Sequence, residues 1–117
     1  MQDLKERYKK FAIDTAILIQ KLPKNTIKIA YCNQLIRSSI SPGTNYRAAL
    51  RGKSTADFIN KLKIVEEELD ESTYFLELLL NFNPTQETEI TRLMKEGNEL
   101  AITVKSIQTT RSKLRIS

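Results

Sequence analysis

The residues of this sequence that could do chemistry are carboxylates, basic side chains and one thiol. Glu67 and Glu71 are four residues apart, so on a helix they lie one turn apart and could hold a divalent cation or act as an acid and base pair. No aspartate-rich calcium loop and no glycine loop for phosphate accompanies them. We therefore interpret both carboxylates as part of a solvated helix face, and we expect no catalytic residue and no metal site.

Cys32 is the single cysteine, and the chain of 117 residues contains no histidine. A single cysteine cannot form an internal disulfide, and a chain without histidine lacks the usual general base and the usual zinc ligands. We interpret Cys32 as a small buried hydrophobe on a helix rather than as a reactive thiol. No run approaches the ~18 apolar residues of a membrane span. The sequence thus predicts a cytoplasmic protein with no cofactor, no small-molecule substrate and no membrane contact.

Basic and acidic residues are concentrated in different segments. The chain carries 19 Lys and Arg against 14 Asp and Glu, a formal charge of +5. Residues 26–53 contain five basic residues and no acidic one, whereas residues 54–84 contain seven acidic residues and two basic ones. On a helical wheel Arg37, Arg47 and Arg51 fall on one side, and Lys53 follows them. We call these four residues the basic stripe.

Two explanations of the basic stripe are open at this point. In the first, its arginines pair with the carboxylates of residues 54–84, within one subunit or between subunits. In the second, they face the phosphates of RNA or DNA, where each contact adds affinity that salt removes. Neutralising Arg47 would separate the two, because it should disturb assembly in the first case and weaken nucleic-acid binding in the second.

Four amphipathic segments must position these side chains. Apolar residues recur at steps of three and four, which is the spacing of one helix face. Only three Gly and three Pro are present, too few for the many turns of a sandwich or barrel. We predict helices at about 3–22, 26–51, 54–83 and 85–113. Short connections favour antiparallel neighbours, so the expected fold is an all-α, up-down-up-down four-helix bundle in a single domain over residues 1–117.

The dipeptide Pro42-Gly43 would ordinarily mark a turn between two helices. The inward face nevertheless keeps its phase across Pro42, which favours one long, kinked helix. Ser38, Ser41 and Asn45 lie on that inward face. Because buried polar groups need partners, we predict that these three form a buried hydrogen-bonded cluster beside the proline.

A second set of apolar residues lies outside the core stripes of the first and third helices. A monomer would expose them, and contiguous exposed apolar surface on a small protein marks an interface. The sequence therefore predicts a homo-oligomer. The interface residues expected from this pattern are Ile13, Ile17, Ile64, Phe75, Leu78 and Phe82.

The segment from Arg37 to Leu79 resembles a known protein family. It carries Asn-Tyr-Arg-Ala-Ala at 45–49, Asp-Phe at 57–58 and Glu-Glu-x-x-Asp-Glu at 66–71. With these spacings it resembles the bacterial four-helix-bundle proteins encoded in intervening sequences of 23S ribosomal RNA genes. The resemblance implies a homopentamer without an established enzymatic activity.

The same fold is similar to the accessory variability protein of diversity-generating retroelements, a basic pentamer that binds a reverse transcriptase and nucleic acid. The resemblance thus implies RNA, DNA or a reverse transcriptase as partners, and it makes the basic stripe a nucleic-acid-binding hypothesis. We expect a non-enzymatic, homo-oligomeric helical scaffold or accessory protein that binds RNA or DNA. The alternative is a purely structural or protein-binding oligomer with no affinity for nucleic acid.

Overall fold

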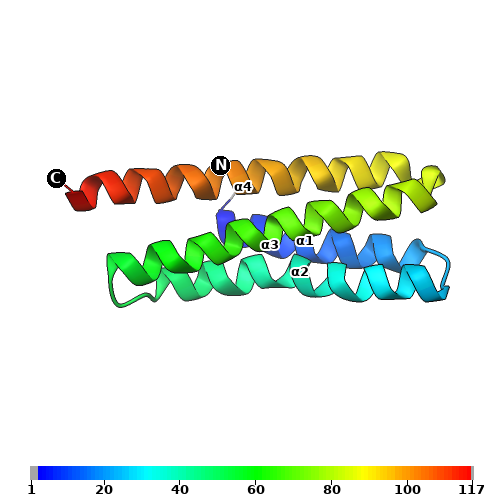
Figure 1. Cartoon of the computed structure of the whole chain (residues 1–117), viewed down its shortest axis with the longest axis horizontal. Helices are drawn as coiled ribbons and strands as arrows, with labels where there is room; N and C mark the ends of the chain where they lie inside the picture. The colour runs from blue at the N-terminus through cyan, green and yellow to red at the C-terminus, as the bar shows by residue number, and fades with distance from the viewer. Residues whose placement is uncertain (1–2, 117) are drawn as a thin grey trace.

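The backbone of residues 3–116 and the side chains of residues 3–114 are described by the structure, a computed structural model. The chain forms α1 (Leu4–Lys21), α2 (Thr26–Leu50), α3 (Thr55–Phe82), the short 3-10 helix η1 (Pro84–Gln86) and α4 (Glu87–Ile116). Consecutive α-helices run antiparallel along a bundle with extents of 52 × 23 × 20 Å (Figure 1). No strand occurs within residues 3–116. The all-helical prediction is therefore confirmed.

The helix boundaries follow from capping residues that are local in the sequence. The Asn25 side chain accepts a hydrogen bond from the backbone N–H of Lys28 at 3.0 Å and caps α2. The Ser54 hydroxyl accepts from the backbone N–H of Asp57 at 3.1 Å and caps α3. Pro84 opens η1, where its missing N–H costs no helical hydrogen bond. The helices accordingly begin and end close to the predicted residues, except that α4 continues to Ile116.

Pro42 lies inside α2, which continues through it as one helix. Pro42 is buried, and a Cβ added to Gly43 would stand 3.3 Å from the Cβ of Tyr8. The glycine thus lets α1 approach α2 closely. One turn further on, the rings of Tyr8 and Tyr46 have centroids 5.0 Å apart. The prediction of a single helix that continues through Pro42 is confirmed, and Pro42-Gly43 serves packing rather than a turn.

The core runs along the inside of all four α-helices. Its fully buried residues include Phe11 and Leu18 of α1, Leu35 of α2, Leu69 of α3 and Leu93 of α4. Each helix packs on its two neighbours, and the pairs α1–α3 and α2–α4 lie diagonally across the bundle. Complete burial of each such side chain contributes about 1.5–3 kcal/mol. None of the helices described carries a stretch long and apolar enough to cross a membrane.

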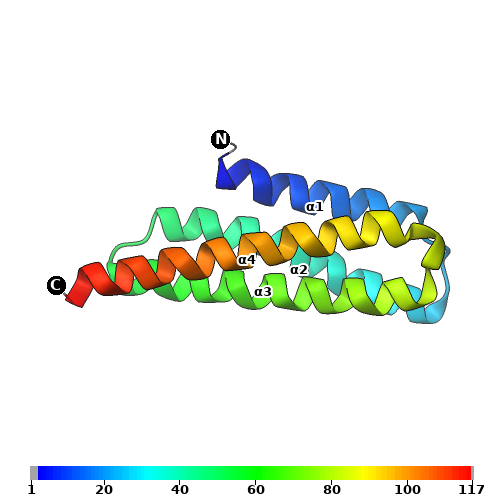
Figure 2. The ribbon, with the colours of Figure 1, turned by 90° about the horizontal axis from the view of Figure 1, so that it is seen from above.

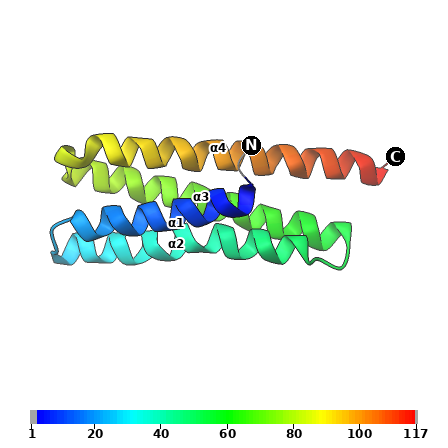
Figure 3. The same ribbon diagram turned by 180° about the vertical axis from the view of Figure 1, so that it is seen from behind.

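The first helix is much shorter than the last. α1 has 18 residues and α4 has 30. Seen from above, the N-terminus of α1 lies near the middle of the bundle (Figure 2). The view from behind shows that the N-terminal end of α1 lies well short of the α2–α3 connection (Figure 3). Among the described residues, one end of the molecule is therefore built from three helices: the last turns of α2, the first turns of α3 and the last turns of α4.

Candidate nucleic-acid interface

Arg37 of α2 is bound by carboxylates of α3. Its guanidinium lies 3.0 Å from the Glu68 carboxylate and also donates to Glu71. The hydrogen bond to Glu71, together with that to Glu68, raises the pKa of Arg37. Arg37 thus follows the first explanation of the basic stripe, which is pairing within one subunit. It does not belong with the cations that lack a carboxylate partner among residues 3–114.

The same contact bears on the carboxylate pair noted in the sequence. Glu71 is engaged by Arg37, whereas Glu67 is exposed. Within the part of the chain that the structure describes, no three His, Cys, Asp or Glu side chains come together as metal ligands. The geometry gives Glu67 and Glu71 no shared site.

Arg37→Gln is expected to lower the free energy of unfolding by less than about 1 kcal/mol, since exposed ion pairs contribute about 0.2–1 kcal/mol. Urea denaturation of Arg37→Gln, Glu71→Gln and the double variant measures the coupling between the two side chains. We expect it to be about 0.5 kcal/mol. Strictly additive single effects would contradict the pairing.

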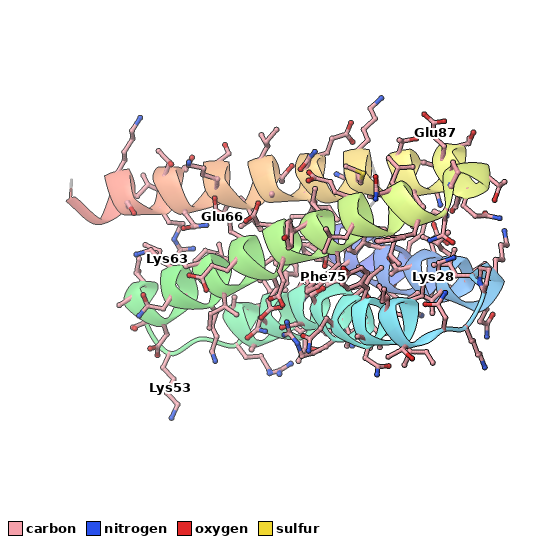
Figure 4. All side chains as sticks on the ribbon, turned by 45° about the vertical axis from the view of Figure 1, so that its right-hand side comes forward. Lys28, Lys53, Lys63, Glu66, Phe75 and Glu87 are labelled. Atoms are coloured by element: carbon pink, nitrogen blue, oxygen red, sulfur yellow. The ribbon has the colours of Figure 1, made fainter. Side chains whose placement is uncertain are left out.

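Arg47, Arg51 and Lys53 behave differently from Arg37. All three are exposed, and none forms an ion pair with any residue in the range 3–114. Arg47 and Arg51 lie one turn apart at the end of α2. Lys53 lies in the α2–α3 connection and extends away from the bundle (Figure 4). These three cations therefore remain accessible to an external anion.

The last turns of α4 add cations that the sequence analysis did not assign to the candidate site. Residues 43–63 contain five basic residues and residues 100–116 contain four, nine in all, and Asp57 is the single acid among them. These two segments meet at the three-helix end of the bundle, which we call the basic end. The other segments hold ten basic and thirteen acidic residues. The signal was present in the sequence, because no acidic residue follows Glu99.

A pocket of about 430 Å³ opens at the basic end. The guanidinium carbon of Arg111 lies 4.6 Å from the centroid of the Phe58 ring, so α4 and α3 meet there in a cation–π contact. Both side chains are half-buried. The pocket is lined by Ala49, Leu50, Gly52, Lys53, Ser54, Thr55, Phe58 and Arg111.

The predicted polar cluster on α2 divides into two parts. The hydroxyls of Ser38 and Ser72 lie 2.9 Å apart and join α2 to α3 inside the core. The Asn45 side-chain amide instead donates to the carbonyl and hydroxyl oxygens of Ser41, at 3.0 and 2.9 Å. Ser41 and Asn45 are only half-buried. The expectation of one buried cluster was wrong, because α3 offers Ser38 a partner across the helix interface.

Three of the six predicted interface residues are exposed and the other three are half-buried. Ile13 and Ile17 of α1 and Phe82 of α3 are exposed to 48%, 45% and 43%. Ile64, Phe75 and Leu78 are half-buried within one chain. Phe75 lies between α3 and α2, with its ring centroid 6.4 Å from that of Tyr31 (Figure 4). The expectation that a monomer exposes these three was wrong, because α3 packs on α2 along a wider face than its main stripe indicates.

Three exposed isoleucines of α2 were missed in the sequence. Ile29, Ile36 and Ile40 are exposed to 47%, 39% and 52%. Their separations of seven and four residues place them on one side of α2. α1 is one of the two neighbours of α2 and carries the exposed Ile13 and Ile17, and we call the five isoleucines together the α1–α2 outer face.

Cys32 is half-buried rather than fully buried. Burial raises the pKa of its thiol above the ordinary value. It borders a pocket of about 320 Å³ between the end of α1 and the start of α2. This environment agrees with a packed, unreactive side chain.

Comparison with known proteins places this arrangement in a wider context. A model of the family described as 23S rRNA-intervening sequence protein matches residues 2–106. Among solved structures, the chain is similar to a protein of unknown function from the S23 ribosomal protein family of Bacteroides thetaiotaomicron. The two share 30% sequence identity over 91% of this chain and 98% of that chain, with a TM-score of 0.82. No curated protein matches the sequence.

Proposed function

The chain belongs to the 23S rRNA-intervening sequence protein family, and we propose that it is a non-enzymatic helical scaffold that assembles with copies of itself and binds RNA or DNA. The basic end carries this proposal. It combines nine basic residues with one acidic residue, and three of its cations, Arg47, Arg51 and Lys53, have no carboxylate partner within residues 3–114.

The distribution of charge matters more here than its sum. The basic end carries a formal +8, and the remaining segments carry −3, so the net +5 hides a strongly polar molecule. A phosphate backbone approaching the basic end is attracted over several residues, while the rest of the surface repels it. Each neutralised phosphate releases counterions and adds affinity. This asymmetry favours a polyanion bound at one end of the bundle.

The α1–α2 outer face supports the proposed self-association. Its five isoleucines, Ile13, Ile17, Ile29, Ile36 and Ile40, are exposed on two adjacent helices. A second copy that covered them would remove apolar surface from water, which is the main driving force of association. We propose a homopentamer, the stoichiometry that the resemblance of residues 37–79 implies.

Replacing Arg47 and Arg51 by glutamine is expected to weaken binding to single-stranded RNA about tenfold at low salt, because two accessible charges are lost. The plot of log affinity against log salt should become less steep by about 0.7 for each phosphate contact removed. Fluorescence anisotropy of a labelled RNA and of a labelled duplex DNA, titrated at about 50 and about 200 mM salt, provides the measurement.

The matched control is Lys28→Gln/Arg37→Gln, which removes two charges from α2 outside the basic end. It should leave both affinity and salt dependence unchanged. Wild-type protein that does not bind at low salt, or binds with no dependence on salt, contradicts the nucleic-acid part of the proposal.

The alternative, a structural or protein-binding oligomer, is favoured by one observation: Arg37 already pairs with α3 carboxylates. If Arg47 paired in the same way with a neighbouring copy, Arg47→Gln would lower the assembled mass and leave any nucleic-acid binding unchanged. Light scattering of this single variant therefore separates the two functions.

A further inference from the structure

We propose that the pocket at the basic end holds one unpaired nucleotide, so that the protein binds single-stranded RNA or DNA in preference to duplex. This inference rests on the proposed function and adds the class of nucleic acid. Its support is the combination, in one cavity, of a stacked arginine, an aromatic ring and a cation without a carboxylate partner among residues 3–114: Arg111, Phe58 and Lys53.

The Arg111 guanidinium is already held for stacking. It lies over the Phe58 ring at 4.6 Å, and both groups line the same pocket. No carboxylate within residues 3–114 pairs with Arg111. A planar guanidinium can carry an aromatic ring on one face and a nucleobase on the other. A base that enters the pocket would therefore stack on a guanidinium that the fold already holds in place. Little side-chain entropy is then lost on binding.

Polar groups around this platform suit the sugar and phosphate. Lys53 borders the pocket and makes no ion pair within residues 3–114. The Ser54 oxygen accepts from the backbone N–H of Asp57, so its own hydroxyl hydrogen is free to donate. Thr55 adds a second hydroxyl. The volume of about 430 Å³ lies within the range of small-ligand sites, roughly 300–1,000 Å³.

Duplexes cannot use such a platform, because their bases are stacked on one another and paired. Single strands can turn a base outward onto aromatic or guanidinium planes, which is how sequence-tolerant single-strand binders gain affinity. Within residues 3–116 the pocket is reachable, because α1 begins at Leu4, near the middle of the bundle, and does not lie alongside the end of α2 (Figure 2). A duplex would contact the outer cations alone.

The test compares a single-stranded RNA of about ten nucleotides with the duplex of the same sequence, using wild type, Arg111→Lys and Phe58→Leu. Arg111→Lys keeps the charge and removes the planar group. We expect both variants to lose about tenfold in affinity for the single strand, equivalent to about 1.4 kcal/mol, with unchanged affinity for the duplex. A 2-aminopurine base in the single strand should be quenched on binding to wild type and much less on binding to Arg111→Lys.

Lys105→Gln, which removes a charge from the same helix away from the pocket, is the matched control and should reduce both affinities alike. Circular dichroism melting confirms that each variant is folded. Equal wild-type affinity for single strand and duplex, or an Arg111→Lys variant that retains quenching and affinity, overturns this inference while leaving the proposed function in place. Absence of binding to either nucleic acid would instead reject both.

Discussion

Glutamate at Ile36 and Ile40 is expected to convert the assembled protein into monomers of 13.5 kDa. These side chains lie one turn apart on the α1–α2 outer face and are exposed to 39% and 52% in the single chain. Two carboxylates on this surface would lose their hydration if a second copy covered them, and burial of an unpaired charge is strongly unfavourable. The fold of each chain should be unaffected, since both positions already face water.

Multi-angle light scattering gives the masses directly. Wild type should show a multiple of the chain mass, five times 13.5 kDa for the proposed pentamer. Ile102→Glu is the control, because Ile102 on α4 is the most exposed large hydrophobe within residues 3–114, at 70%, and lies outside the α1–α2 outer face. Monomeric wild type, or an assembly that persists in the Ile36→Glu/Ile40→Glu variant, contradicts assembly through this face.

Phe11→Ala should produce the largest loss of stability of any single change that we consider, about 3–5 kcal/mol. Phe11 is 1% exposed, and a Cβ added to Gly97 of α4 would come within 3.5 Å of its ring. Truncation removes the ring that fills the space beside this glycine. The backbone of a helix cannot collapse into the space, so a cavity remains.

Urea denaturation at fixed protein concentration measures this effect. Because domains of this size are stable by about 5–15 kcal/mol, the midpoint should fall steeply. Ile102→Ala is the matched control, and its expected effect is within about 0.5 kcal/mol because the side chain is largely in water. A loss below about 1 kcal/mol for Phe11→Ala would mean that α4 does not pack on α1 through Gly97.

Features that depend on neighbouring residues could be predicted from the sequence. Asn25 and Ser54 cap the helices that follow them, because a cap needs only a side chain and an N–H three residues later. The continuity of α2 through Pro42 could also be predicted from the phase of its inward face. The packing role of Gly43 could not be predicted, since it depends on the close approach of Tyr8 from α1.

The candidate site was predicted only in part, because some of its contacts join residues on different helices. The sequence placed Arg47, Arg51 and Lys53 in one basic stripe with Arg37 and left open which of them pair with carboxylates. The pairing of Arg37 with Glu68 and Glu71 depends on the register between α2 and α3. The contact between Arg111 and Phe58 joins residues far apart in the chain. Periodicity within one helix gives no information about the offset between two helices, so such pairs emerge only in the folded bundle.

A ring built through the α1–α2 outer face, with its axis along the bundles, would have a further property. Rotational symmetry would place every copy's three-helix end on the same rim. A single strand bound at one pocket would then find the next pocket at high effective concentration, and weak individual contacts would combine into avidity. Because α1 is short, the pockets on this rim would all be accessible. A strand long enough to follow the rim would then bind far more tightly than a short one.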